Sequence, residues 1–147
     1  MTVVAAEYQN IYSSGFKVEN IFTHSQTEIW GQNFWQGPDK KPTEFVLDLG
    51  CSKNINTAEL VNIHNAGYKD SSTKEFKVFV SQNPAGPWAE VIHETLEDSR
   101  QQKDPLPVLF FSFPEVRARY IKFNLVDWYG ARGGLQYFAL KKYDTFA

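Results

Sequence analysis

Alternation of apolar and polar positions is the dominant pattern along this chain. In residues 43–50, TEFVLDLG, the apolar positions Phe45, Leu47 and Leu49 recur at every second residue, and Gly50 ends the run. A period of two places alternate side chains on the same face of an extended strand. These residues are therefore predicted to form a half-buried β-strand.

The same alternation returns in residues 72–81, STKEFKVFVS, and in residues 118–126, ARYIKFNLV. Shorter apolar runs at 58–63 and 107–113 lack the alternation, which predicts more fully buried strands. Pro- and Gly-rich segments separate the runs, and no long helical stripe is present, although residues 89–100 would allow a turn or two of helix. The pattern predicts an all-β chain, folded as an antiparallel β-sandwich or barrel.

Composition sets the limits within which this fold must work. At 147 residues the chain has room for one core, so a single domain spanning 1–147 is expected. The formal net charge of −2 argues against a general attraction to nucleic acid, and no nucleic-acid partner is expected. Cys51 is the only cysteine and is interpreted as a buried or turn thiol. The first ten residues lack the pattern of a signal peptide. The localisation therefore stays open: extracellular for part of a processed secreted chain, otherwise cytoplasmic.

Five motifs follow one another in order along the chain. They are W-x14-FVLDLG from Trp30 to Gly50, TKEFKVFVS from Thr73 to Ser81, GPWAEV from Gly86 to Val91, ARYIKFNL from Ala118 to Leu125 and YGARGGLQYFAL from Tyr129 to Leu140. Together they closely resemble the discoidin domain, also called the coagulation factor V/VIII type C domain, a galactose-binding-like fold. The resemblance implies a discoidin-like jelly roll of about eight strands. It also implies binding of galactose-type glycans, anionic lipid head groups, collagen or other proteins, rather than catalysis.

The resemblance also bears on metal binding. In the carbohydrate-binding branch of the family, a segment like N-x-x-D-G-x-x-x-T-x-W and an acidic residue near the last strand help to hold a structural calcium. Here Thr23 and His24 occupy the Asp-Gly positions, and Gln136 offers no carboxylate. Calcium prefers about six to eight oxygen ligands including carboxylates, so we expect no metal and no other cofactor, although backbone carbonyls could supply part of a calcium site.

Members of this family present ligands on loops at one end of the sandwich, and three loops match by motif: residues 24–42, 64–73 and 127–134. A sugar site needs a flat ring against the pyranose and polar groups for the hydroxyls. The candidate rings are Trp35, Tyr68, Trp128 and Tyr129, and the candidate hydrogen-bonding groups are His64, Asn65, Lys69, Asp70 and Arg132.

Other conspicuous residues are better explained by structure than by chemistry. Trp30 and Trp88 are interpreted as core tryptophans, and Arg119, at the start of a strand, as one half of a structural salt bridge. The three histidines are not at metal-ligand spacing, and no nucleophile or phosphate-binding motif is present. We therefore predict no catalytic residue.

These features favour a non-catalytic, lectin-like module that binds galactose-type glycans. One alternative is a membrane-surface binder that inserts Phe34 and Trp35, beside Lys40 and Lys41, into anionic lipid. Another is an intracellular domain that recognises a protein partner. A single shallow sugar site binds weakly, so oligomerisation would raise the avidity of any of these modules.

Arg132 lies in GARGG, where glycines allow a tight excursion of the chain away from the sheet. We expect it to face solvent and to project beside the Trp35 loop and the 65–70 loop. On that interpretation the Arg132→Ala variant loses ligand affinity but keeps nearly all of its stability.

Overall fold

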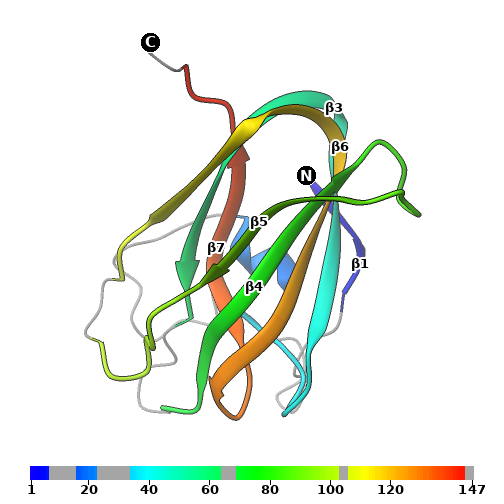
Figure 1. Ribbon diagram of the computed structural model, residues 1–147. Coiled ribbons are helices and arrows are strands. Elements are labelled where there is room, and N and C mark those ends of the chain that lie inside the picture. Colours follow the sequence, from blue (N-terminus) through cyan, green and yellow to red (C-terminus); the bar gives the residue numbers. More distant parts are fainter. Residues whose placement is uncertain (7–15, 23–33, 64–68, 103–105, 145–147) are drawn as a thin grey trace.

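The computed structural model describes residues 1–6, 16–22, 34–63, 69–102 and 106–144. These residues form a short 3-10 helix and an antiparallel sheet (Figure 1). The elements are β1 (Thr2–Ala5), η1 (Val18–Ile21), β2 (Trp35–Gln36), β3 (Thr43–Asn62), β4 (Ser71–Ser81), β5 (Ala89–Thr95), β6 (Leu109–Gly130) and β7 (Gly134–Lys141). The prediction of an all-β, antiparallel fold is confirmed. No helix in the described ranges is long and apolar enough to span a membrane.

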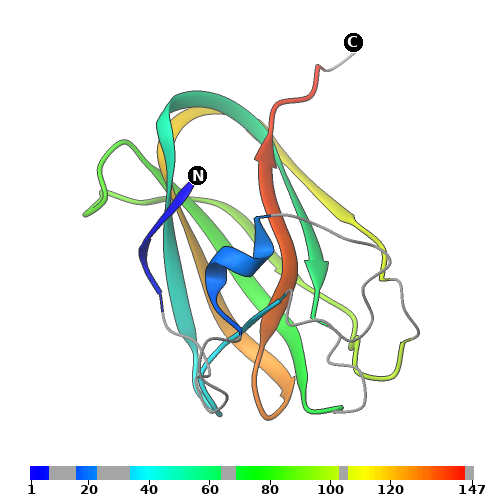
Figure 2. The same ribbon diagram turned by 180° about the vertical axis from the view of Figure 1, so that it is seen from behind.

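The two long strands, β3 and β6, fold this sheet over on itself. Residues 43–48 of β3 pair with 120–125 of β6, and 57–60 pair with 109–112. Between these two ladders the register shifts twice, and the strands arch over together at the top of Figure 1. β1, β4 and β5 lie in the layer formed by the first half of β3 and the second half of β6. β7 and β2 lie in the layer formed by the second half of β3 and the first half of β6. The result is a two-layered β-sandwich, which the reverse view in Figure 2 also shows.

Gly50 lies in the arch of β3. Its φ of +95° is in the left-handed region that glycine adopts without strain, and its N–H donates to Asp48 Oδ1 at 2.7 Å. The glycine was predicted to end a strand, with a separate strand at 58–63, but it bends one continuous strand instead. Two pairs of apolar runs that were predicted as separate strands are each joined into one continuous strand, β3 and β6. The described chain therefore has seven strands rather than about eight.

β5 corrects a second expectation. Residues 89–100 were predicted to allow a turn or two of helix, but residues 89–95 are extended and pair with β4. The free edge of β4 offers backbone hydrogen bonds to a whole strand, and this outweighs the weak local preference for helix.

A stack of phenylalanine rings joins three strands of the first layer. Phe123 of β6 lies between Phe45 of β3, with ring centroids 5.1 Å apart, and Phe76 of β4, at 5.3 Å. From the second layer, Phe138 of β7 meets Phe123 edge-on at 5.5 Å, and Trp35 of β2 meets Phe45 edge-on at 5.1 Å. All five rings are fully buried. This cluster therefore fastens the two layers to each other.

The burial of Trp35 overturns its predicted role in ligand binding, because a fully buried ring cannot stack on a sugar. Phe34 is buried as well and stacks on Phe16 at 4.8 Å between centroids. The lipid-binding alternative used Phe34 and Trp35 as exposed tips, and that role of these two residues is wrong for the same reason.

Two other residues differ from expectation, while Trp30 lies outside the described residues. Trp88 is only partly buried, on the surface of the sandwich, where the Lys122 ammonium lies over its ring at 4.7 Å. Of the two alternatives for Cys51, a buried or a turn thiol, burial is wrong, because Cys51 is exposed beside Gly50 in the arch. The predicted structural salt bridge of Arg119 is confirmed: its Nε donates to Asp48 Oδ1 at 3.0 Å and its Nη2 to Asp48 Oδ2 at 3.1 Å.

Asp48 supplies a test of pH dependence. The hydrogen bonds from Arg119, and next the one from Gly50, hold the pKa of Asp48 below its ordinary value of 3.8. A carboxyl whose pKa is lowered by folding stabilises the protein above its unfolded-state pKa, and that contribution disappears as pH falls through the folded-state pKa. We expect Asp48→Asn to lower the urea midpoint at neutral pH, and the difference from the parent protein to vanish as pH falls below 3.8. Parallel pH profiles for the two proteins would contradict this.

The ring stack predicts which phenylalanine matters most. Phe123→Ala removes the central ring and should lower the free energy of unfolding by about 3–5 kcal/mol, measured by urea denaturation. Phe110, whose side chain is 60% exposed, is the matched control. Phe110→Ala should change stability by no more than about 0.5 kcal/mol. Equal losses in the two variants would show that the stack is not the centre of the core.

Candidate functional site

Three loops meet at the end of the sandwich opposite the arch, at the bottom of Figure 1. We call residues 37–42, 69–70 and 127–134 the loop end. Their backbones are joined by hydrogen bonds from Lys40 N to Ala131 O at 2.8 Å and from Ala131 N to Asp70 O at 2.8 Å. Glycine is required in this turn, because an added Cβ at Gly134 would collide with the carbonyl oxygen of Trp35. The loops thus form one connected surface.

Arg132 lies at the centre of this surface. Its Nε donates to Asp39 Oδ1 at 2.8 Å, and its Nη1 donates to Asp70 Oδ2 at 2.8 Å. Burial by itself lowers the pKa of Arg132, but the hydrogen bonds to Asp70 and Asp39 raise it overall, so the guanidinium stays charged. Arg132 therefore ties together two loops that are far apart in sequence.

The predicted position of Arg132 is confirmed, but its predicted exposure is wrong. It lies beside both neighbouring loops, as expected, yet its side chain is only 11% exposed, against 50% for Asp39 and 41% for Asp70. The turn lays Arg132 down onto the sheet, where its carbonyl accepts a hydrogen bond from Ser72 N at 3.0 Å. Within this Arg132 cluster, the groups that face solvent are consequently the two carboxylates, while Lys40, Lys41 and Lys69 are also exposed on the loop end.

A buried polar network supports the loop end from below. Gln36 Nε2 donates to Ser71 Oγ at 2.7 Å, and Ser71 Oγ donates to Asp70 Oδ1 at 3.1 Å. Thr73 Oγ1 donates to Gly134 O at 2.6 Å. Because such buried groups lose much when a partner is removed, the network holds the Asp70 carboxylate in one orientation.

The two aromatic residues predicted to bind ligand on this turn, Tyr129 and Trp128, differ in their contacts with the rest of the protein. The Tyr129 hydroxyl donates to Leu96 O at 2.9 Å, and the Lys74 ammonium lies over the ring at 5.4 Å. Trp128 is partly exposed, and its indole N–H donates no hydrogen bond within the described part of the chain. Tyr129 thus has a structural role in the turn, whereas the Trp128 ring and N–H are available.

The remaining candidates are only partly described. Lys69 is exposed and its Nζ donates to Gln101 Oε1 at 3.2 Å. His64, Asn65 and Tyr68 lie outside the described residues. No group of three His, Cys, Asp or Glu side chains is arranged to hold a metal ion in the ranges that the structure describes.

Asp39, Asp98 and Arg100 were missed by the sequence analysis. Arg100 pairs with Asp98, with Nη2 to Oδ2 at 2.8 Å, and its Nη1 would lie 3.0 Å from a Cβ added at Gly130. All three residues occupy turn-like segments, where charged side chains usually face only water. No local signal distinguished Asp39, because its partner Arg132 is 93 residues away, and the Asp98–Arg100 pair matches no motif.

Comparison with known proteins places this geometry in a family. The F5/8 type C domain model matches residues 4–139. No curated protein sequence matches the chain. Among solved structures, a similar fold occurs in the CpGH89CBM32-5 module from Clostridium perfringens in complex with GalNAc-β-1,3-galactose (TM-score 0.70, 14% identity, covering 95% of this chain and 92% of the other). The family 32 carbohydrate-binding module of Streptococcus pneumoniae EndoD has a TM-score of 0.71 at 12% identity, covering 97% and 95%. Chitosan-binding module 1 from Paenibacillus sp. IK-5 has a TM-score of 0.66 at 19% identity, covering 95% and 91%.

The placement of Arg132 predicts a loss of stability on mutation. Arg132→Ala should lower the free energy of unfolding by about 1–3 kcal/mol, because Asp39 and Asp70 lose their shared counter-charge. Arg117 is the matched control, since it is exposed and its side chain makes only a 3.4 Å hydrogen bond, to Asn54 Oδ1, within the described residues. Arg117→Ala should have almost no effect on the urea midpoint. An unchanged midpoint for Arg132→Ala would mean that the guanidinium does not hold the loops together.

Proposed function

Since the chain belongs to the F5/8 type C domain family, we propose that it is a non-catalytic module that binds glycans, of the galactose type, at the loop end. Structures with the same fold support a glycan ligand: one holds GalNAc-β-1,3-galactose and another is a chitosan-binding module. Those ligands differ from each other, so the fold supports glycans as a class, and the side chains of the loop end must select among them.

The observation that carries the proposal is the combination of one available ring with two oriented carboxylates. The partly exposed Trp128 ring provides a flat apolar surface for one face of a pyranose, and its N–H is a free donor. Asp39 and Asp70 are half exposed and accept hydrogen bonds from sugar hydroxyls. Arg132 holds both carboxylates in place before the ligand arrives, which lowers the entropic cost of binding.

The same contacts favour binding over hydrolysis. A glycosidase needs one carboxylic acid that donates a proton and one carboxylate that acts as base or nucleophile. Asp39 and Asp70 both accept a hydrogen bond from the same guanidinium, so they make equivalent contacts. This symmetric arrangement does not divide the two carboxylates into an acid and a base.

A comparison of two tryptophans tests the proposal. Trp128→Ala should weaken binding of the best ligand from a glycan array about tenfold or more, because the stacking surface is lost. Trp88→Ala removes an equally partly buried ring outside the loop end and should leave affinity unchanged. Binding is measured by calorimetry, and the fold of each variant is checked by circular dichroism.

Two outcomes would count against the proposal. One is a glycan array without signal, together with galactose that moves no amide resonance of residues 127–134. The other is a Trp128→Ala variant that is folded and binds as tightly as the parent protein, which would place the ligand elsewhere.

A further inference from the structure

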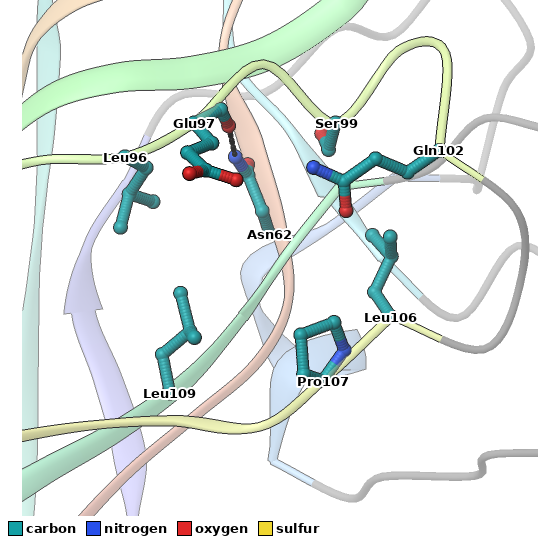
Figure 3. A pocket seen from close by; sticks show the side chains of 8 residues that line it. All are labelled: Asn62, Leu96, Glu97, Ser99, Gln102, Leu106, Pro107 and Leu109. Atoms are coloured by element: carbon teal, nitrogen blue, oxygen red, sulfur yellow. Dashed lines mark hydrogen bonds between the residues drawn. The ribbon is translucent and has the colours of Figure 1, made fainter.

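A pocket lies outside the loop end, at the edge of the sandwich where the end of β3 meets the segment between β5 and β6. It is a pocket of about 110 Å³, and Figure 3 shows the side chains that enclose it. Its apolar wall consists of Leu96, Leu106, Pro107 and Leu109. No residue of the loop end lines it, so a ligand of this pocket would be distinct from a ligand of the loop end.

Most hydrogen-bond donors on the polar side chains of this pocket already donate to other atoms of the protein. Asn62 Nδ2 donates within the protein, to Thr73 O at 3.1 Å and more weakly to Glu97 O at 3.4 Å. Ser99 Oγ donates to Ile63 O at 2.6 Å, and Gln102 Nε2 donates to Asp98 O at 3.2 Å. Acceptors predominate among the groups left for a ligand, so a complementary ligand must bring donors.

Glu97 adds a carboxylate to the hydrogen-bond acceptors of this pocket. Its carboxylate forms no ion pair or hydrogen bond with any described residue, although nine other salt-bridge contacts are present in that part of the chain. In Figure 3 the carboxylate end of Glu97 turns toward the space beside Leu96 and Asn62, and the Gln102 amide points into the same space. Glu97 is exposed, so its carboxylate lies at the open side of the pocket, where a cation can reach it while an attached apolar chain contacts the leucines.

We propose that this pocket binds a short alkylammonium group. The ammonium donates to the Glu97 carboxylate and to Gln102 Oε1, while the methylene chain lies along Leu96, Leu106 and Leu109. The size agrees with this ligand, because an enclosed cavity of about 150 Å³ binds benzene, and the smaller volume here suits a short chain better than a ring. The group can come from a lysine side chain of a polypeptide or from a free polyamine, which share this chemistry.

The test is a methyl-detected NMR titration of the intact protein with n-butylammonium. We expect shifts of the Leu96, Leu106 and Leu109 methyl resonances. We also expect affinity to fall about tenfold in Glu97→Gln, the cost of a lost charge-assisted hydrogen bond. Glu94→Gln, another exposed glutamate just outside the pocket, should bind as the parent does. Neutral n-butanol, with the same chain length, should bind at least about tenfold more weakly than n-butylammonium.

Further measurements distinguish the two sources of the ammonium group and define the results that would overturn the proposal. Tighter binding of Nα-acetyl-lysine amide than of putrescine assigns the site to polypeptide lysines, and the reverse assigns it to free polyamines. If n-butylammonium moves none of the three methyl resonances, or if folded Glu97→Gln binds it as the parent does, the proposal is overturned. Glu97→Asp, which keeps the charge, should retain part of the affinity and so distinguishes loss of charge from loss of fold. Because Trp128 does not line the pocket, failure here leaves glycan binding at the loop end untouched.

Discussion

The constraint on which the rest of this structure depends is the continuous passage of β3 and β6 through both layers. The β2–β3 and β6–β7 connections and the start of β4 fall at the end opposite the arch, whereas the β4–β5 connection lies at the arch end. Aromatic rings from the two layers meet between them and help to stabilise this arrangement. The stack of Phe45, Phe123 and Phe76 is capped edge-on by Phe138 and Trp35, and aromatic pairs in this geometry attract beyond their buried area. The core thus determines where a ligand site can form.

Because the loops gather at one end, two carboxylates come close together, and Arg132 offsets the repulsion between them. Asp39 and Asp70 come from connections 93 and 62 residues away from it, and both carboxylates converge on the same region. Two like charges held close would repel, but a guanidinium between them neutralises the repulsion and fixes both orientations. The polar network under Asp70 then prevents the group from relaxing. Rigidity at the loop end is therefore a property of the folded scaffold rather than of a bound ligand.

Much of the fold could be predicted because period-two alternation reports directly on strands that are half buried, as in residues 43–50 and 118–126. The order of motifs further indicated the jelly roll and the loops that meet. Burial of particular side chains could not be predicted in the same way. Trp35 has the residue type of a sugar platform, and only the position of β2 beside β7 makes it core. Gly50 gives the same local signal whether a strand ends or bends. The burial of Arg132 depends on Asp39, whose turn carries no sign of its distant partner.

The two proposed sites differ in how their carboxylates are balanced, and this difference separates their proposed ligands. At the loop end, Asp39 and Asp70 share the charge of Arg132, so their oxygens act mainly as hydrogen-bond acceptors, which suits the hydroxyls of a neutral sugar. At the edge pocket, Glu97 has no counter-charge among the described residues and stands beside leucines, so it favours a cation with an apolar chain. A chain with a formal net charge of only −2 can in this way hold two sites of different character. The sign and pairing of the nearest charges, rather than the overall charge, decide what each site selects.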